Sequence, residues 1–322
     1  MKFRVCLAIA SWGISLLASV SAQAAYPDKP IKLVVPYAAG GPTDTFARAL
    51  TDVWGKKLGA TMIVENKAGA GTMLGTEAVA KSAPDGYTVL LATVAHSVNP
   101  SLHASLSYDP IKDFSSVGLA ARAPLVLVVN NDVPVQSITE FFDYLKGNPG
   151  QVNYASAGIG SAPHLGGALL NYTGKFNAIH VPYRGSAPAM ADVIGGHAQF
   201  MMDSAPTGLA QVHAGTVRLL ATTMKDRLPQ TPDVPALAEY LPGYEAYTWN
   251  AALVREGTSA EVIEKLRSSL EAALQDEGLK EKANTMGLVL EKQPNPVDLD
   301  TFIDAEINKW RDVVKASDMS SN

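Results

Sequence analysis

Residues 31–44, IKLVVPYAAGGPTD, join a short apolar run to a glycine-rich loop. The run from Ile31 to Val35 has the length and the β-branched composition of a buried parallel strand. Beyond the loop, apolar residues recur at the spacing of one helix face; they are Phe46, Leu50, Val53, Trp54 and Leu58. Gly59 follows them and predicts the end of the helix. The segment therefore predicts a strand, a glycine loop and a helix, which together are a building unit of α/β sheets.

The same unit recurs along the chain. Strands are predicted at 61–64 and 87–92 with a helix at 72–81 between them, so the first three strands form a parallel sheet with right-handed crossovers. A second series begins with the apolar run at 125–129, and a capping box of Ser137 and Glu140 predicts the start of a helix that ends at Gly147. The further strands of this series are predicted at 152–155, 178–181, 199–202 and 218–221, and its further helices at 162–172, 188–194 and 207–214.

The last quarter of the chain returns to the first series. The strand-like run 248–254 leads back, and two amphipathic helices follow, the first of them capped by Thr258 and Glu261. We expect an α/β protein of two lobes, each with a parallel-type sheet, joined by crossing strands. The first lobe is predicted to comprise residues 25–124 and 248–322, and the second lobe residues 125–247.

The first 24 residues have the layout of a secretory signal peptide. Lys2 and Arg4 precede a mostly apolar run from Leu7 to Val20, which is short for a membrane span of about 20 residues. The sequence Ala22-Gln-Ala24 supplies a cleavage site, so we expect cleavage after Ala24 and a periplasmic protein. Because the only cysteine, Cys6, is removed with the signal, the mature chain excludes disulfides, thiolate metal sites and cysteine nucleophiles.

The charge of the mature chain excludes two classes of partner. Removal of Lys2 and Arg4 leaves 24 basic and 31 acidic residues, which gives a net charge of −7 at neutral pH. A mildly acidic chain without basic clusters argues against binding to nucleic acid or to anionic membranes. No second apolar stretch reaches the length of a membrane span.

Three loops that follow predicted strands are rich in glycine and in small hydroxyl residues: 36–44, 155–164 and 181–188. Ligands of open α/β sheets bind beyond the carboxyl ends of the strands. Glycines let the backbone approach a ligand closely, and helix N-termini present unpaired N–H groups with a partial positive charge. The first two loops, one in each lobe, therefore predict an anion site between the lobes that needs no arginine.

Several side chains near these loops have alternative roles. Asp44 either accepts N–H bonds at a helix start or binds a ligand amine or hydroxyl, and Asp203 either orients loop amides or touches ligand. Tyr183 offers an aromatic wall, and Arg184 either pairs with a carboxylate or lies on the surface. The predicted ligand-binding residues are Tyr37, Ala39, Gly40, Gly41, Thr43, Asp44, Thr93, His96, Ser156, Gly158, Gly160, Ser161, His164, Tyr183, Arg184, Gly185 and Asp203.

Longer stretches of the sequence resemble one protein family. They are YPDKPIKLVVPY at 26–37, VENKAGAG at 64–71, PDGYT at 84–88, YDPIKDF at 108–114 and VPYRGS at 181–186, together with Trp249. They cover the whole mature chain in order and are similar to the Bug family, the extracytoplasmic solute receptors of tripartite tricarboxylate transporters.

This resemblance implies a Venus-flytrap fold of the periplasmic binding protein type. A ligand carboxylate would be held by backbone N–H groups and ordered waters from the loops at Gly40–Asp44 and Ser156–Ser161. The implied ligands are amino, hydroxy, di- or aromatic carboxylates, and the implied partners of a monomeric receptor are the membrane permease subunits. Arg184 stands where many members have lysine.

Other functions fit the residues less well. The GAGTMLG stretch at 69–75 has GxGxxxG rather than GxGxxG spacing and follows the second strand, and no GxxxxGK[ST] loop is present, which argues against a nucleotide-dependent enzyme. Ser161 and His164 lack a GxSxG elbow, which argues against a hydrolase. The six histidines have no zinc-type spacing, so we expect no metal, no cofactor and no catalysis. A ligand sensor without a dedicated permease stays open as an alternative role.

A placement of the site in the first two loops predicts the effect of larger side chains there. A bulky residue in place of Gly41 or Gly160 is expected to abolish ligand binding while the fold stays intact. Normal binding by such variants in a ligand-induced thermal shift would contradict this placement.

Overall fold

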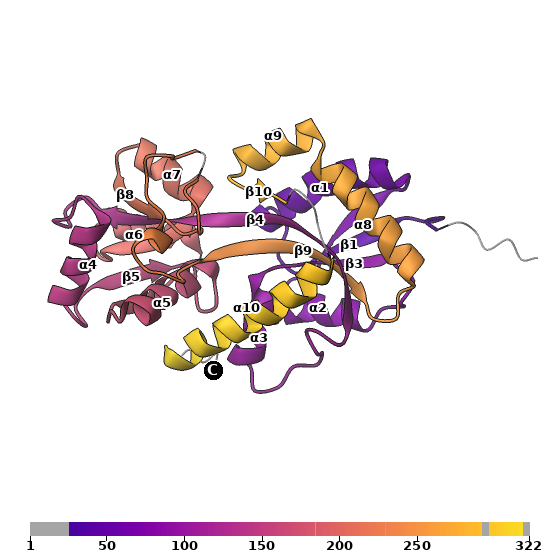
Figure 1. The fold of residues 1–322 in the computed structure, drawn as a ribbon, viewed down its shortest axis with the longest axis horizontal. Helices are drawn as coiled ribbons and strands as arrows, with labels where there is room; N and C mark the ends of the chain where they lie inside the picture. The colour runs from indigo at the N-terminus through magenta and orange to yellow at the C-terminus, as the bar shows by residue number, and fades with distance from the viewer. Residues whose placement is uncertain (1–25, 184, 229, 292–295, 318–322) are drawn as a thin grey trace, which may run out of the picture.

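The computed structural model describes residues 26–183, 185–228, 230–291 and 296–317. The predicted signal peptide with its cleavage site, Cys6 and Arg184 lie outside the described residues. The described chain forms two groups of helices and strands, with two long strands running between them (Figure 1).

The first lobe is built on the predicted strand–helix–strand series. Strand β1 (Ile31–Val35) pairs in parallel with both β2 (Met62–Asn66) and β3 (Thr88–Ala92). Helices α1 (Pro42–Leu58) and α2 (Met73–Ala80) connect these strands, as predicted. All residues of β1 except Lys32 are buried, because both faces of the strand are covered. Gly59 ends α1 in the left-handed conformation, which confirms its predicted role.

The second lobe repeats this arrangement. Its parallel strands are β5 (Asn153–Ser156), β6 (Ile179–Pro182) and β7 (Phe200–Ser204), in the order β7-β5-β6. A further strand, β8, covers Val217–Thr222. The helices of this lobe are α4 (Ile138–Gly147), α5 (Ala162–Gly174), α6 (Ser186–Ile194) and α7 (Ala205–His213). Ser137 caps α4 as predicted.

Two antiparallel strands cross between the lobes. Strand β4 (Phe114–Asn130) pairs with β9 (Tyr247–Arg255) from Phe114 opposite Arg255 to Pro124 opposite Tyr247. Beyond Pro124, β4 pairs instead with β7 and β8 of the second lobe. The predicted return strand at 248–254 is therefore confirmed. The predicted first strand of the second series, near 125–129, is only the last part of a strand that starts eleven residues earlier.

Three other elements differ from the sequence prediction. Helix α3 (Val94–Leu102) follows β3 directly, and helix α9 (Glu277–Thr285) with the short strand β10 (Val289–Leu290) follows α8 (Ala260–Leu274). The cap of α8 is Ser259, whose hydroxyl accepts from the Val262 N–H, so the predicted cap by Thr258 is wrong. Thr258 donates its hydroxyl proton backwards to the Arg255 carbonyl instead. Short 3-10 helices at Ala70–Thr72 and Leu237–Glu239 complete the described elements.

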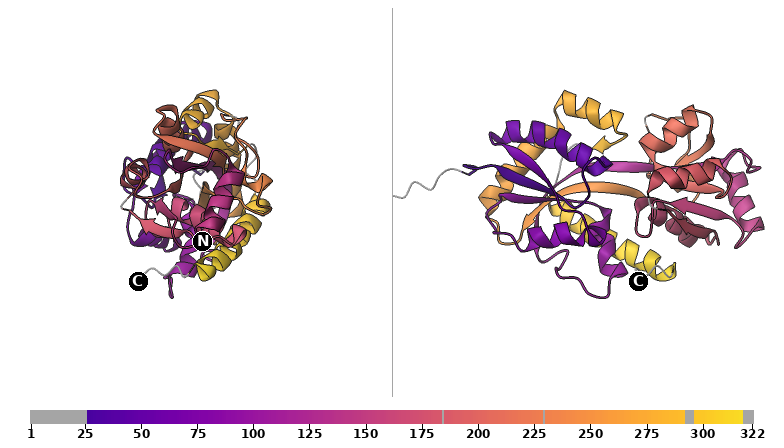
Figure 2. Two further views of the ribbon diagram at one scale, coloured as in Figure 1. Left: turned by 90° about the vertical axis from the view of Figure 1, so that its left-hand side faces the viewer. Right: turned by 180° about the vertical axis from the view of Figure 1, so that it is seen from behind.

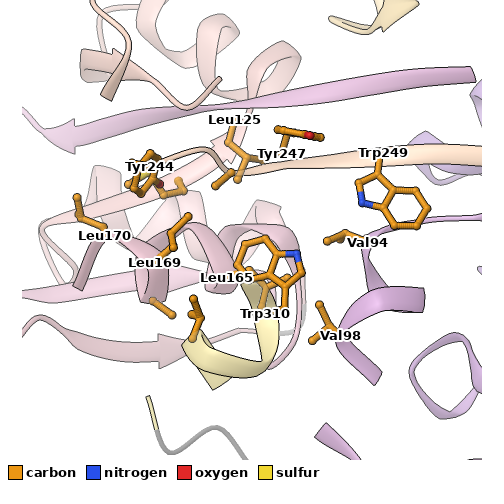
Figure 3. Packing of buried hydrophobic residues seen from close by; sticks show 14 of the residues in the cluster. Val94, Val98, Leu125, Leu165, Leu169, Leu170, Tyr244, Tyr247, Trp249 and Trp310 are labelled. Atoms are coloured by element: carbon orange, nitrogen blue, oxygen red, sulfur yellow. The ribbon is translucent and has the colours of Figure 1, made fainter. Parts of the chain in front are cut away.

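Helix α10 (Pro296–Ala316) extends from the first lobe toward the second (Figures 1 and 2). Its Trp310 lies between α5 side chains such as Leu165 and α3 side chains such as Val98, within one buried apolar cluster (Figure 3). The carboxylate of Glu306 lies beside it and accepts from two indole N–H groups, Trp310 Nε1 at 2.9 Å and Trp249 Nε1 at 3.2 Å. This buried carboxylate thus fastens the C-terminal helix to the crossing strand β9.

Replacement of Glu306 by leucine is expected to lower the free energy of unfolding by about 2–4 kcal/mol, because two buried indole N–H groups lose their acceptor. Glutamine keeps an acceptor oxygen and loses the ion pair with Lys309, so it is expected to cost less than half as much. Urea unfolding of both variants measures this difference, and equal costs would contradict it.

Candidate functional site

Six of the described helices follow the carboxyl ends of parallel strands. In the first lobe, α1, α2 and α3 follow β1, β2 and β3; in the second, α5, α6 and α7 follow β5, β6 and β7. Because parallel strands end at a common edge, the connecting loops gather at one edge of each lobe. The two edges face each other, since a Cβ atom at Gly160 of the second lobe would lie 2.9 Å from Leu102 Cδ1 of the first.

All of these helices except α5, which Ser161 caps, differ at their N-termini from α4, α8 and α9. Helices α4, α8 and α9 are each capped by a side-chain oxygen, from Ser137, Ser259 and Asp276. In contrast, α1, α3, α6 and α7 have no side-chain cap, and α1 and α6 begin at Gly41 and Gly185. First-turn N–H groups have no partner within a helix, so an uncapped start leaves donors and a partial positive charge for another acceptor.

The carboxylate of Asp44 does not cap the first turn of α1 but holds the first loop. Its Oδ2 accepts from the Gly40 N–H at 2.8 Å and from Arg48 Nε at 3.0 Å, and its Oδ1 accepts from Asn66 Nδ2 at 2.9 Å. The hydrogen bonds from Arg48 and Gly40 lower the pKa of Asp44 to about 2, so the group stays ionised. Of its two predicted roles, this geometry realises the acceptance of loop N–H bonds.

The second loop has the same arrangement with a different acceptor. His164 Nδ1 accepts from the Gly160 N–H at 3.1 Å, as Asp44 accepts from Gly40 four residues earlier. Both glycines have positive φ, +74° at Gly160 and +84° at Gly40, which a larger residue adopts only with strain. In each loop, the third residue of the helix thus fixes the glycine that precedes the N-cap.

Ser156 and Ser161 complete this loop. The Ser161 hydroxyl donates to the Gly158 carbonyl at 2.6 Å and caps α5 by accepting from the His164 N–H. It therefore has no hydrogen bond to the His164 ring of the kind that activates a nucleophile. Ser156 Oγ is buried, accepts from the Gly158 N–H at 3.1 Å and lies 2.6 Å from His180 Nε2.

His180 was not among the predicted residues. Its ring stacks face to face on His164, with centroids 3.6 Å apart and planes 6° apart. Burial lowers the pKa of His180 to about 4, and burial with the neighbouring His180 lowers that of His164 to about 3. No local motif points to this contact, and only the register of β5 and β6, which pairs Tyr154 with His180, indicates it.

The remaining first-lobe candidates divide into two groups. The Tyr37 hydroxyl lies 2.7 Å from Thr93 Oγ1, which ties the first loop to the start of α3, and Ala39 is exposed in that loop. Thr43 is partly exposed in the first turn of α1. The His96 ring, in contrast, packs against Tyr108 and Phe114 and its Nε2 contacts the Pro110 carbonyl oxygen at 2.8 Å, within the first lobe. The structure thus brings Tyr37 and Thr93 together, whereas His96 packs inside the first lobe, against Tyr108 and Phe114.

The third loop is anchored by carboxylates. The Tyr183 hydroxyl donates to Asp192 Oδ2 at 2.5 Å, and burial with this bond raises the pKa of Tyr183 to about 12. Asp203 is fully buried, accepts from the Thr207 hydroxyl at 2.5 Å and interacts with the Ser186 hydroxyl. It therefore joins the first turns of α6 and α7, beside the uncapped N-cap Gly185.

The described residues contain neither a cluster of metal-binding side chains nor a helix suited to span a membrane. In that part of the chain, no three His, Cys, Asp or Glu side chains lie close enough to hold a metal ion. Likewise, no helix within it has both the length and the apolar composition of a membrane span.

Most of the chain matches one known protein family. Residues 46–319 match TctC, described as the tripartite tricarboxylate transporter family receptor. The periplasmic binding protein BugD is 36% identical in sequence, and its structure superposes with a TM-score of 0.76 over 92% of this chain and 100% of its own.

Two further solved structures contain a named ligand. Rpa4515 of R. palustris, solved with adipate, is 30% identical with a TM-score of 0.77, and the match covers 92% of this chain and 100% of that one. MatC (Rpa3494) of Rhodopseudomonas palustris, solved with bound malate, is 32% identical with a TM-score of 0.75, over 90% of this chain and 100% of that one. The fold described above is therefore that of a two-lobed periplasmic binding protein, as expected.

The stacked histidines predict a pH dependence of stability. The unfolded chain takes up protons at histidine below a pH of about 6.5, whereas folded His180 stays neutral down to about 4. The unfolded state then binds more protons, so the free energy of unfolding falls as the pH drops through this window. The stability difference between wild type and His180→Gln, measured by urea unfolding, is expected to shrink from pH 7 to pH 4. Parallel pH profiles would contradict this.

Proposed function

This chain belongs to the TctC family of tripartite tricarboxylate transporter receptors, and from this premise we propose that it captures a small carboxylate between its lobes and delivers it to the membrane subunits of such a transporter. The family and its solved neighbours are periplasmic solute-binding proteins rather than enzymes. The proposed ligand class is amino, hydroxy, di- or aromatic carboxylates. Malate in MatC and adipate in Rpa4515 support a carboxylate.

The observation that carries the proposal is the pair of uncapped helix starts. The N-cap residue is Gly41 for α1 in the first lobe and Gly185 for α6 in the second, and neither helix has a side-chain acceptor for its first-turn N–H groups. A bound carboxylate supplies the missing acceptors and the negative charge that a helix N-terminus favours.

The charges around these helix starts support an anionic ligand. The one carboxylate in the first loop, Asp44, is neutralised by two hydrogen bonds from Arg48. In the second loop the corresponding acceptor is the neutral imidazole of His164. Neither of these two loops therefore places an uncompensated negative charge beside the proposed ligand. Beside the start of α6, Asp203 accepts from the Thr207 hydroxyl and interacts with that of Ser186, and burial raises its pKa, which favours the uncharged form.

The proposed mechanism is closure of the two lobes on the ligand. The lobes, 25–124 with 248–322 and 125–247, rotate about the crossing strands near Pro124. Contacts of the ligand with both loops favour the closed form, which the membrane partner recognises. The proposed contacts come from Ala39, Gly41, Thr43, Thr93, Ser156, Gly158, Ser161, Arg184 and Gly185. The other predicted residues, apart from His96, hold these in place.

The test is a thermal-shift panel of small carboxylates on wild type and Gly41→Leu. A ligand at 100 times its dissociation constant is expected to stabilise wild type by about 2.7 kcal/mol. Gly41 has negative φ, and the nearest atom to an added Cβ is the Ala38 carbonyl oxygen at 3.8 Å, so leucine fits the fold and covers the start of α1. Gly41→Leu is therefore expected to keep its stability and lose the shift.

Gly147→Leu is the matched control, because an added Cβ there meets no atom within 4 Å and the residue ends α4. It is expected to respond to ligand as wild type does. Gly160→Leu is a poorer probe than the sequence indicated, since its positive φ and the contact with Leu102 disturb the loop itself. A panel in which sugars or peptides shift the protein and carboxylates do not would rule out the proposal.

A further inference from the structure

The second loop is held from behind by two imidazoles. His164 Nδ1 accepts directly from the Gly160 N–H, and His180 Nε2 engages Ser156 Oγ, which in turn accepts from the Gly158 N–H. Both glycine N–H groups of this loop therefore depend on the stacked pair. Tyr154 of β5 stacks on His180 with centroids 5.0 Å apart and fixes the pair against the sheet.

The directions of these hydrogen bonds determine the protonation of both rings. A backbone N–H only donates, so His164 Nδ1 must carry no proton. Ser156 Oγ already accepts from Gly158, and it lies closer to His180 Nε2, at 2.6 Å, than to the Gly158 carbonyl oxygen, at 3.3 Å. We therefore assign the hydroxyl proton to the bond with His180. His180 Nε2 is then an acceptor too. The two neutral rings therefore accept through different nitrogens, Nδ1 in His164 and Nε2 in His180.

The loop also has a backbone conformation that depends on its glycines. Gly158 has a φ of +121° and Gly160 a φ of +74°, and an added Cβ at Gly158 would lie 3.2 Å from the Tyr183 carbonyl oxygen. Ile159 between them is more than half exposed, at 55%, and gives the loop little burial. The hydrogen bonds to the imidazole pair are thus a main restraint on this segment.

We propose that the stacked pair of His164 and His180 is a positioning device that presets the loop at 156–161 for its ligand. His180 acts through Ser156 and does not itself touch ligand. This inference rests on the proposed function for the identity of the ligand, but not for the restraint on the loop. Loss of the His164 acceptor frees the Gly160 N–H, and loss of the His180 acceptor frees the Ser156 hydroxyl that holds the Gly158 N–H. Binding must then also restore the order of the loop.

The test uses the different acceptor atoms of the two rings. An asparagine side-chain oxygen reaches the position of Nδ1, and a glutamine oxygen reaches that of Nε2. His164→Asn and His180→Gln are therefore matched replacements, and His164→Gln and His180→Asn are mismatched ones. A cavity of about 460 Å³ borders both rings, so the changes in shape find room.

Two measurements are made on the full-length mature protein. Hydrogen–deuterium exchange of peptides spanning 153–165 reports on the ligand-free loop, and titration calorimetry with malate and adipate reports on affinity. The mismatched variants are expected to exchange faster in this segment and to bind about tenfold more weakly, the loss of one hydrogen bond. The matched variants are expected to stay within about threefold of wild type.

Other results would overturn the inference. One is unchanged exchange and affinity in all four variants. Another is an equal loss in all four that follows their melting temperatures, which would mean a structural role only. If wild type binds neither malate nor adipate, the proposed ligand class is in question, and the exchange pattern of the four variants alone decides whether the pair positions the loop.

Discussion

The antiparallel ladder of β4 and β9 is the constraint on which the rest of the molecule depends. These strands are central members of a sheet path that runs from β2 in the first lobe to β6 in the second. The backbone hydrogen bonds of one strand, β4, continue from one lobe into the other and so connect the two lobes through a shared strand. Trp249 on β9 adds α10 to this framework through Glu306. This framework sets the distance between the loop edges of the two lobes, which face each other across it.

A second regularity appears at the helix starts. In α1 and α5, and also in α4, the third residue of the helix accepts from the N–H of the residue before the N-cap, through Asp44, His164 and Glu140. The local geometry is common to all three helices, but the acceptor varies with its surroundings. Asp44 is balanced by Arg48, Glu140 is exposed to solvent, and His164 is neutral. Where an anion is expected nearby, the chain uses an acceptor that carries no net charge or has its charge balanced.

Much of the fold could be predicted from the sequence because its units are locally encoded. The apolar run of β1, the glycine loop and the periodic face of α1 are all visible within thirty residues. The first half of β4 was missed because it is buried on both faces and contains small residues such as Gly118 and Ala120. Its sequence therefore shows no alternation of apolar and polar residues. Helix α3 was missed because it contains Pro100, which usually ends a helix.

The candidate site was predictable only where one loop carries all of it. The glycines of both loops stand out in the sequence, and so does Asp44. His180 does not, because its partners Ser156 and His164 come from another strand and helix, and only strand register brings the three together. The predicted ligand contacts of the site residues stay predictions. The structure adds the hydrogen bonds by which some of these residues hold the loops in place.

The place of the crossing strand in the chain also has a consequence for biogenesis. Leu90 of β3 pairs with Leu253 of β9, and Trp310 near the C-terminus completes the buried cluster between α3 and α5. The N-terminal part of the sheet therefore lacks its neighbour until most of the chain has been synthesised, while residues 125–247 already contain all of β5 to β8. Contacts of such long sequence separation form slowly. During synthesis, β1 can therefore pair with β2 and β3 early, whereas the other edge of β3 stays open until β9 has been made.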